Sequence, residues 1–93
     1  MKYSKTQIKE KLKTTKGWYF EDNSIKKKFI TKSFPVTLGL VTSIGALCQQ
    51  FDHHPDYLTL KYAEIEVSFS THTEGGVSEK DFEIAKQINL LKF

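Results

Sequence analysis

A strict alternation of apolar and polar residues in AEIEVSFST, residues 63–71, constrains the fold of this chain more than any other feature. Ile65, Val67 and Phe69 alternate with glutamates and serines, which is the pattern of a β-strand with one side in a core. The intervening polar side chains point to the other side, toward water. The sequence therefore predicts a sheet that is covered on one face and left partly open on the other.

Three further β-rich runs complete a predicted sheet of four antiparallel strands. YLTLK, residues 57–61, precedes the alternating segment and pairs with it as one hairpin. GWYFED, residues 17–22, and IKKKFIT, residues 25–31, form another hairpin, for which we expect an Asn-Ser turn at residues 23–24.

Three helices are predicted around these hairpins. Ser4 and Gln7 have the spacing of a capping box, Ser33 can cap a central helix that ends near residue 50, and Ser78 with Asp81 forms a second capping box before a final amphipathic helix. The order is helix, hairpin, helix, hairpin, helix. We therefore predict an α+β fold, a four-stranded antiparallel sheet with three helices packed on one face.

The length of 93 residues suits one domain, and we expect a single domain over residues 1–93. So small a core would gain from subunit association, which favours an oligomer.

The longest apolar stretch, FPVTLGLVTSIGALC, is interrupted and too short to span a membrane, and the charged N-terminus lacks the apolar core of a signal peptide. Together with a single cysteine, Cys48, these features favour a cytoplasmic protein that does not contact membranes.

The net charge of +3 is mild, and the most basic run, IKKKFITK, fits the solvated side of a strand. Its lysines are not interleaved with the arginines and aromatic residues that nucleic-acid surfaces use. We therefore expect no direct binding of nucleic acid.

All three histidines of the chain lie close to the second hairpin. His53 and His54 stand side by side in FDHHPDY, and His72 lies in FSTHTEGG. Residues that enter the first strand of a hairpin and leave its second strand lie at the same end, so the three imidazoles can share a site. Pro55 pushes His54 out of helical geometry and ends the central helix.

Metal-free acid/base chemistry suits these histidines better than a metal site or a nucleophile. No histidine pair has the spacing that aims two rings at one ion, no cysteine stands near, and Cys48 belongs to a core pattern. One imidazole can take a proton while another, held protonated by a carboxylate such as Asp52, donates one. This pair of proton transfers describes a dehydration.

The segments DHHPDY and STHTEGGVSEKD resemble the pterin-4a-carbinolamine dehydratases, known in animals also as the dimerisation cofactor of a homeodomain transcription factor. Tyr62 precedes His72 by ten residues and Asp81 follows it by nine, as in that family. Gly17, Trp18 and the order of predicted elements agree too, so the resemblance covers nearly the whole chain. It implies removal of water from 4a-hydroxytetrahydrobiopterin to give quinonoid dihydropterin, in tetrahydropterin recycling and without a metal or cofactor.

The resemblance also implies roles for single residues. His53 and His72 would form the acid/base pair, His54 would hold the pterin and share in proton transfer, and Asp52 would orient or charge a histidine. The substrate-binding residues would be Asp52, Trp18, Gln49, Pro55, Ser70, Thr71 and Asp81. Trp18 has a structural alternative as a core residue, and Asp81 has one as a helix cap.

Two departures from the family and two other functions stay open at this point. Gln49 occupies a position where the family prefers a charged residue, and the stretch from Pro55 to Tyr62 is one residue longer than in animal members, which we expect to form a bulge. The chain could instead be a non-catalytic oligomeric protein-binding module of the transcriptional coactivator type, or a pterin-binding protein of molybdopterin metabolism. The expected partners are a pterin substrate and further copies of the chain in a homodimer or homotetramer.

Overall fold

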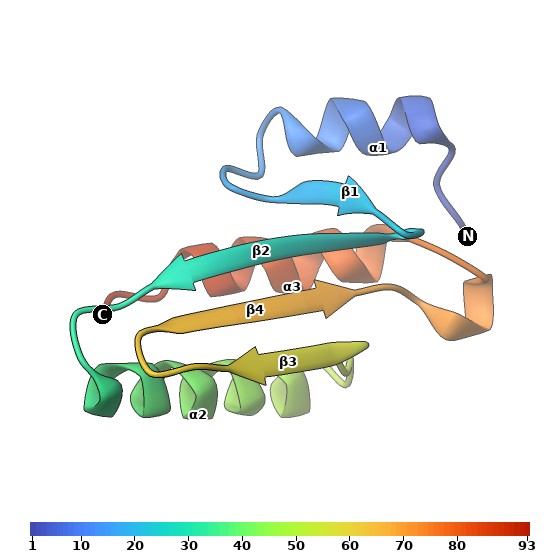
Figure 1. Cartoon of the computed structure of the whole chain (residues 1–93). Helices are drawn as coiled ribbons and strands as arrows, with labels where there is room; N and C mark the ends of the chain where they lie inside the picture. The colour runs from blue at the N-terminus through green and yellow to red at the C-terminus, as the bar shows by residue number, and fades with distance from the viewer.

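A four-stranded antiparallel sheet in the order β1-β2-β4-β3 forms the centre of the computed structural model, which describes residues 1–93 (Figure 1). The strands are β1 (Tyr19–Glu21), β2 (Ser24–Ile30), β3 (Tyr57–Leu60) and β4 (Glu64–Phe69). The helices are α1 (Lys5–Leu12), α2 (Phe34–Gln50) and α3 (Glu79–Asn89), with a short 3-10 turn, η1 (His72–Glu74), after β4.

Helices α2 and α3 lie behind the sheet in Figure 1, on the same face, and α1 lies beyond the β1 edge, where its Ile8 joins the core. The predicted α+β fold, with two hairpins and three helices in that order, is confirmed. None of the helices is long and apolar enough to cross a membrane.

The alternating segment supplies the centre of the core, as its pattern predicts. Ile65, Val67 and Phe69 are fully buried, together with Ile25 of the neighbouring strand β2 and Ile44 of α2. Full burial of each such side chain contributes about 1.5–3 kcal/mol relative to exposure. The opposite face of the sheet carries the polar residues of the alternation, so hydroxyl and carboxylate groups are free to gather there.

The predicted helix caps are present at all three N-termini. Ser4 with Gln7 and Ser78 with Asp81 form reciprocal capping boxes, and the Ser33 hydroxyl accepts a hydrogen bond from the Val36 backbone. These side chains satisfy backbone N–H groups that have no partner within the helix. The position of Asp81 in its box also fixes where its carboxylate lies relative to the end of β4.

Both hairpins differ from the sequence prediction in their connections. The first turn is made by Asp22 and Asn23, with φ values of 51° and 60°, and Ser24 already belongs to β2, so the predicted Asn-Ser turn is wrong by one residue. A two-residue hairpin turn of type I′ has left-handed backbone at both positions, which aspartate and asparagine tolerate. In the second hairpin the register runs without interruption from Tyr57 opposite Ser68 to Leu60 opposite Ile65, and residues 61–63 connect the strands. The expected bulge is therefore absent from the paired residues.

Candidate active site

The exit of α2 orients the first two histidines through a backbone turn. Asp52 has a φ of 51°, its N–H donates to the Gln49 carbonyl at 3.3 Å, and the His53 N–H donates to the Cys48 carbonyl at 3.0 Å. This pattern satisfies the last carbonyls of the helix and reverses the chain. It directs His53 back toward the sheet instead of onward along the helix axis.

A small loop after β4 presents the third histidine. Thr71 and Gly76 form a β-bridge, with the Thr71 N–H donating to the Gly76 carbonyl at 2.8 Å, and His72 begins η1 between them. Gly75 has a φ of 78°, a left-handed conformation that glycine adopts without steric cost. His72 thus projects from a closed loop, whereas the sequence pattern placed it in the continuing strand.

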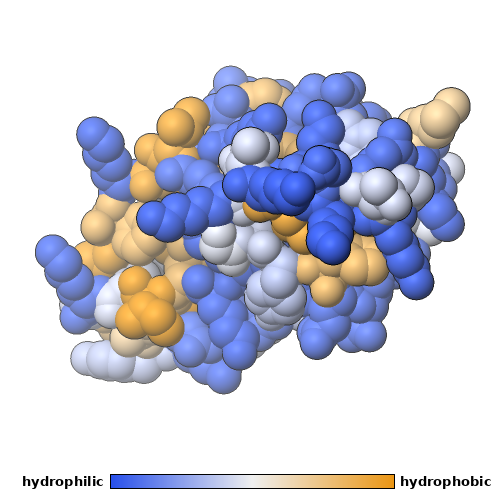
Figure 2. Space-filling view, turned by 90° about the horizontal axis from the view of Figure 1, so that it is seen from above, coloured by the Kyte–Doolittle hydropathy of each residue, from blue (hydrophilic) through white to orange (hydrophobic).

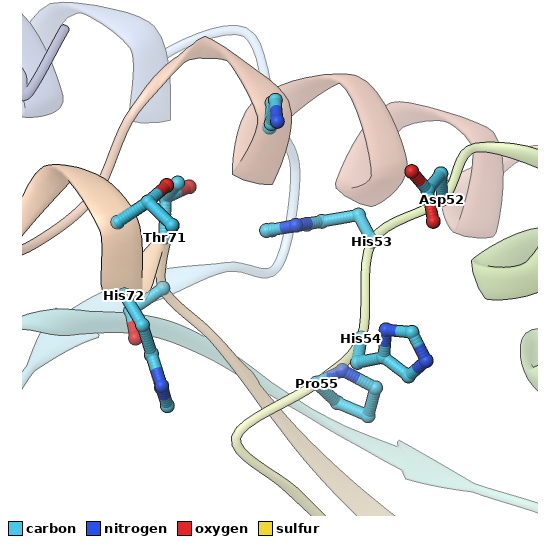
Figure 3. Close-up of a pocket in the computed structure, with 9 residues that line it drawn as sticks. Asp52, His53, His54, Pro55, Thr71 and His72 are labelled. Atoms are coloured by element: carbon cyan, nitrogen blue, oxygen red, sulfur yellow. The ribbon is translucent and has the colours of Figure 1, made fainter.

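Between these two segments lies a cavity of about 250 Å³ (Figure 3). Its lining contains no large apolar side chain. The lining residues are Asp52, His53, His54, Pro55, Ser70, Thr71, His72, Thr73 and Lys80. The structure thus brings the three histidines around one polar cavity.

His53 is held by a buried carboxylate. Its Nε2 lies 2.5 Å from Oδ1 of Asp81, and the two side chains are 10% and 0% exposed. The other Asp81 oxygen accepts hydrogen bonds from the Thr71 hydroxyl at 2.9 Å and the Ser78 backbone N–H at 2.8 Å. The imidazole also stacks on Phe69, with ring centroids 5.8 Å apart. These contacts fix the ring and leave Nδ1 as its nitrogen without a protein partner.

His72 pairs with a different carboxylate, that of Asp56. Its Nε2 lies 2.9 Å from Oδ1 of Asp56, and the side chains are 82% and 18% exposed. Asp56 also accepts hydrogen bonds from the hydroxyls of Ser70, Ser24 and Ser68, at 2.6, 2.8 and 3.0 Å. Partial burial acts to raise the pKa of Asp56, but the hydrogen bonds from Ser70, Ser24, His72 and Ser68 together lower this pKa below its ordinary value.

His54 lies at the cavity without a hydrogen-bond partner. Figure 3 shows the His53 ring extending toward Thr71 and the His54 ring pointing away from it. His54 is exposed, whereas His53 is buried. Of the three imidazoles, His54 is therefore the one that a ligand could reorient most easily.

The remaining candidate residues divide into those at the cavity and those away from it. Asp52, Pro55, Ser70 and Thr71 line it, although Asp52 makes no hydrogen bond to a histidine. Gln49 is exposed on α2 and does not line the cavity.

Two aromatic residues of the family pattern also lie away from the cavity. Trp18 is buried, its Nε1 donates to the Asn89 side chain at 3.0 Å, and its ring packs against Phe69. This environment matches the core alternative for Trp18. Tyr62 lies in the connection after β3 and stacks on Phe34 with ring centroids 5.7 Å apart.

Three residues near the histidines escaped the sequence analysis. Thr73 and Lys80 line the cavity, and Asp56 holds His72. The sequence does carry a signal for Asp56, since it precedes β3 directly and Ser70, just after β4, continues the polar side on which Ser68 lies. Only the pairing of the strands shows that these groups meet.

Proton transfer is the chemistry that this arrangement offers. No three side chains among His, Cys, Asp and Glu gather in a geometry that could hold a metal ion. Burial raises the pKa of the Cys48 thiol, which disfavours the reactive thiolate. The structure therefore shows a small α+β protein in which two histidine–carboxylate pairs, groups of the kind that can exchange protons, lie at one polar cavity.

Comparison with known proteins identifies the family more closely. The sequence profile of the family described as pterin 4 alpha carbinolamine dehydratase matches residues 1–91. A relative from Sulfolobus acidocaldarius is 42% identical over 92 residues, covering 99% of this chain and 100% of its own length. One from Aquifex aeolicus is 36% identical, with 97% and 90% covered. Both carry the name pterin-4-alpha-carbinolamine dehydratase provisionally. This chain belongs to the pterin-4a-carbinolamine dehydratase family.

A solved structure supports the same fold. The crystal structure of a protein described as a transcriptional coactivator/pterin dehydratase from Brucella melitensis superposes with a TM-score of 0.90, at 27% sequence identity and 96% coverage of both chains. The fold predicted from sequence is therefore the fold of this family.

Proposed function

We propose that this protein is a 4a-hydroxytetrahydrobiopterin dehydratase, a lyase that removes water from its substrate to give quinonoid dihydropterin in tetrahydropterin recycling. The observation that supports the proposal most is the presence of His53 and His72 at one polar cavity, each hydrogen-bonded to its own carboxylate. Membership of the family supplies the substrate class.

The proposed reaction needs two proton transfers and no change of oxidation state. One imidazole takes the proton of a ring N–H, and the electron pair of that bond forms a carbon–nitrogen double bond to C4a. The bond from C4a to the hydroxyl breaks, and a second imidazole, in its protonated form, donates a proton so that the oxygen leaves as water. The reaction is balanced without a cofactor.

The carboxylates of Asp81 and Asp56 suit a reaction in which one histidine takes a proton and the other donates one. With Nε2 of His53 and Nε2 of His72 both bound to carboxylates, each ring offers Nδ1 for exchange of a proton. A neighbouring carboxylate also stabilises an imidazolium, so either pair can store the proton that the leaving hydroxyl needs. His54, exposed and without a protein partner, would contact the pterin directly.

The test is the ultraviolet decay of freshly generated 4a-hydroxytetrahydropterin at mildly alkaline pH, where the spontaneous reaction is slower. The rate should rise in proportion to added protein, and His72→Ala should lower the enzymatic rate by about 10²- to 10⁴-fold without loss of fold. Gln50→Ala, exposed at the end of α2 and outside the cavity, is the control and should keep the full rate.

A folded protein that gave no acceleration would refute this function. The two alternative functions, a protein-binding module and a pterin-binding protein of molybdopterin metabolism, would then be the ones to test.

The proposal includes a cytoplasmic homo-oligomer. The outer side of α2 exposes Phe34 and Leu38. A second cavity of about 270 Å³ lies beside this helix, lined by Val36, Gly39, Leu40, Ser43, Leu91, Lys92 and Phe93. Exposed apolar surface of this kind is suited to a second copy of the chain.

The single cysteine, a buried free thiol, fits a reducing compartment.

A further inference from the structure

We propose that Asp56 is the positioning residue for His72, holding the imidazole by Nε2 so that Nδ1 is the nitrogen that exchanges a proton with the substrate. This inference rests on the proposed dehydratase function. It deepens that function by assigning a role to a residue that does not itself line the cavity but is hydrogen-bonded to His72 and Ser70, which do.

The hydrogen bonds to Asp56 form a complete cradle. Its Oδ1 accepts from Ser70 and His72, and its Oδ2 accepts from Ser24 and Ser68. A carboxylate has about four lone-pair sites, so these four donors use its capacity. Asp56 is therefore not left with an oxygen for the substrate, and its influence must pass through His72.

The cradle is built by elements that are rigid relative to one another. Ser24 lies on β2, Ser68 is a fully paired residue of β4, and Ser70 follows the end of β4. Backbone pairing therefore fixes the oxygen to which His72 binds, before any substrate arrives. An exposed ion pair alone contributes little stability because both side chains must be ordered. Here one partner is ordered in advance, which favours a single orientation of an otherwise exposed ring.

The two histidine–carboxylate pairs share one design. In both, Nε2 of the ring meets Oδ1 of an aspartate, and hydroxyl groups from the end of β4 hold that aspartate: Thr71 for Asp81 and Ser70 for Asp56. The repetition at Ser70 and Thr71, the two residues directly after β4, indicates that orientation of both rings, and not only of the buried one, is a feature of the site.

Asp56 is the carboxylate bonded to His72, whereas Asp52, which lines the same cavity, makes no hydrogen bond to a histidine. On the same sheet face Lys26 approaches Glu21 at 3.6 Å and Asp22 at 3.5 Å, and the Tyr57 hydroxyl donates to Glu66 at 2.9 Å. On the loop of His72, Glu74 pairs with the N-terminal amine at 3.0 Å. Lys80 is the cation that lines the cavity. The lowered pKa of Asp56 keeps it charged across the range in which a histidine titrates.

The deciding experiment combines NMR of the ring nitrogens of His72, which shows which nitrogen carries the proton of the neutral ring, with the kinetics of dehydration, in wild type and in Asp56→Asn. In wild type the proton should be held on Nε2 by Asp56, and loss of the carboxylate should allow both tautomers to be populated. It should also lower kcat by about 10- to 100-fold with little change in KM. Asp56→Glu should restore part of kcat because it restores the charge.

Glu66→Gln is the matched control, since it removes a carboxylate from the same face that is bonded to Tyr57 and not to a histidine. It should leave both the ring-nitrogen signals of His72 and kcat as in wild type. If Asp56→Asn fails to fold, Ser24→Ala is the second variant. It removes one hydrogen-bond donor to Asp56, outside the cavity, and should lower kcat by about two- to fivefold.

The proposal is overturned if folded Asp56→Asn shows the wild-type ring-nitrogen signals of His72 and the wild-type kcat. The dehydratase function can fail separately, since a wild type that does not accelerate dehydration still allows the NMR measurement. In that case unchanged ring-nitrogen signals of His72 in Asp56→Asn would reject the positioning role, and changed signals would retain it.

Discussion

Adjacent histidines in this chain have opposite environments. His53 is buried against Phe69 and bonded to Asp81, whereas His54 is exposed and bonded to no protein group. The reversal of the chain at Asp52 and the rigid Pro55 separate the two rings. The same residue type is therefore part of the packed fold at one position and free of protein partners at the next.

Alanine substitutions should separate these two environments. His53→Ala leaves the buried Asp81 carboxylate without one of its donors, and we expect the free energy of unfolding to fall by about 1–3 kcal/mol. His54→Ala should change it by no more than about 0.5 kcal/mol, because an exposed side chain without partners is removed. Denaturant unfolding of both variants checks this, and equal losses would contradict the structure.

Asp56 should make the stability of the protein depend on acid pH. Its pKa in the folded state is below the ordinary value of 3.8, because hydrogen bonds outweigh partial burial. The ionised carboxylate therefore stabilises the fold above that ordinary value, and this contribution is lost as the pH falls through the folded pKa.

The comparison is the free energy of unfolding of wild type and Asp56→Asn, measured at about pH 7 and about pH 3. The free energy of unfolding of wild type should exceed that of Asp56→Asn by more at the higher pH. An equal difference at the two pH values would show that the hydrogen bonds do not favour the charged form of Asp56.

At the scale of elements, the start of α3 belongs to the fold and to the site at once. Asp81 completes the capping box with Ser78, and the same carboxylate holds His53. The start of α3 fixes the position of Asp81, and Asp81 fixes the ring of His53. A substitution at this helix cap should therefore also change the orientation of His53.

The two capping boxes offer an internal comparison. The Ser78 hydroxyl is buried and hydrogen-bonded to Thr71 at 2.6 Å, whereas the Ser4 box at α1 is exposed. Ser78→Ala should therefore cost about 1–2 kcal/mol of stability and Ser4→Ala about 0.5 kcal/mol. Ser78→Ala should also slow dehydration, while Ser4→Ala should not. Equal effects of the two substitutions, measured by denaturation and by the decay assay, would contradict this account.

Patterns that are local in sequence predicted the elements well, and contacts between distant elements escaped prediction. The alternation from Glu64 to Phe69 and the spacing of Ser78 and Asp81 depend on strand and helix geometry, so sequence alone was sufficient for them. The bond from Ser24 to Asp56 joins residues 32 positions apart. It depends on which strands are neighbours and in which register, so the sequence suggested Asp52 where the structure shows Asp56 and Asp81 at the histidines.

For the whole molecule, the distribution of apolar surface is uneven. Figure 2 shows hydrophobic side chains collected on the side where β2 ends and the C-terminus lies, and hydrophilic ones over much of the rest of that view. Ile30, Leu90 and Phe93 are exposed, as are Phe34 and Leu38 of α2. A monomer would leave all of these side chains in water, which is the basis for expecting association.

Sedimentation equilibrium should show a mass of at least twice the 10.7 kDa of one chain. Leu38→Glu places a charge on the exposed side of α2 and should raise the dissociation constant by about tenfold or more. Thr14→Glu, exposed after the end of α1, is the control and should associate as wild type does. A wild type that sediments as a monomer at high concentration would reject the oligomer.

The polar lining of the first cavity has a calorimetric consequence. A flat ring that enters it meets imidazoles, hydroxyls and a lysine, and no large apolar side chain. Since the heat-capacity change of association follows the apolar surface removed from water, that change should be small here. The enthalpy of pterin binding would then be favourable and nearly constant with temperature, and affinity would fall steadily as the solution is warmed.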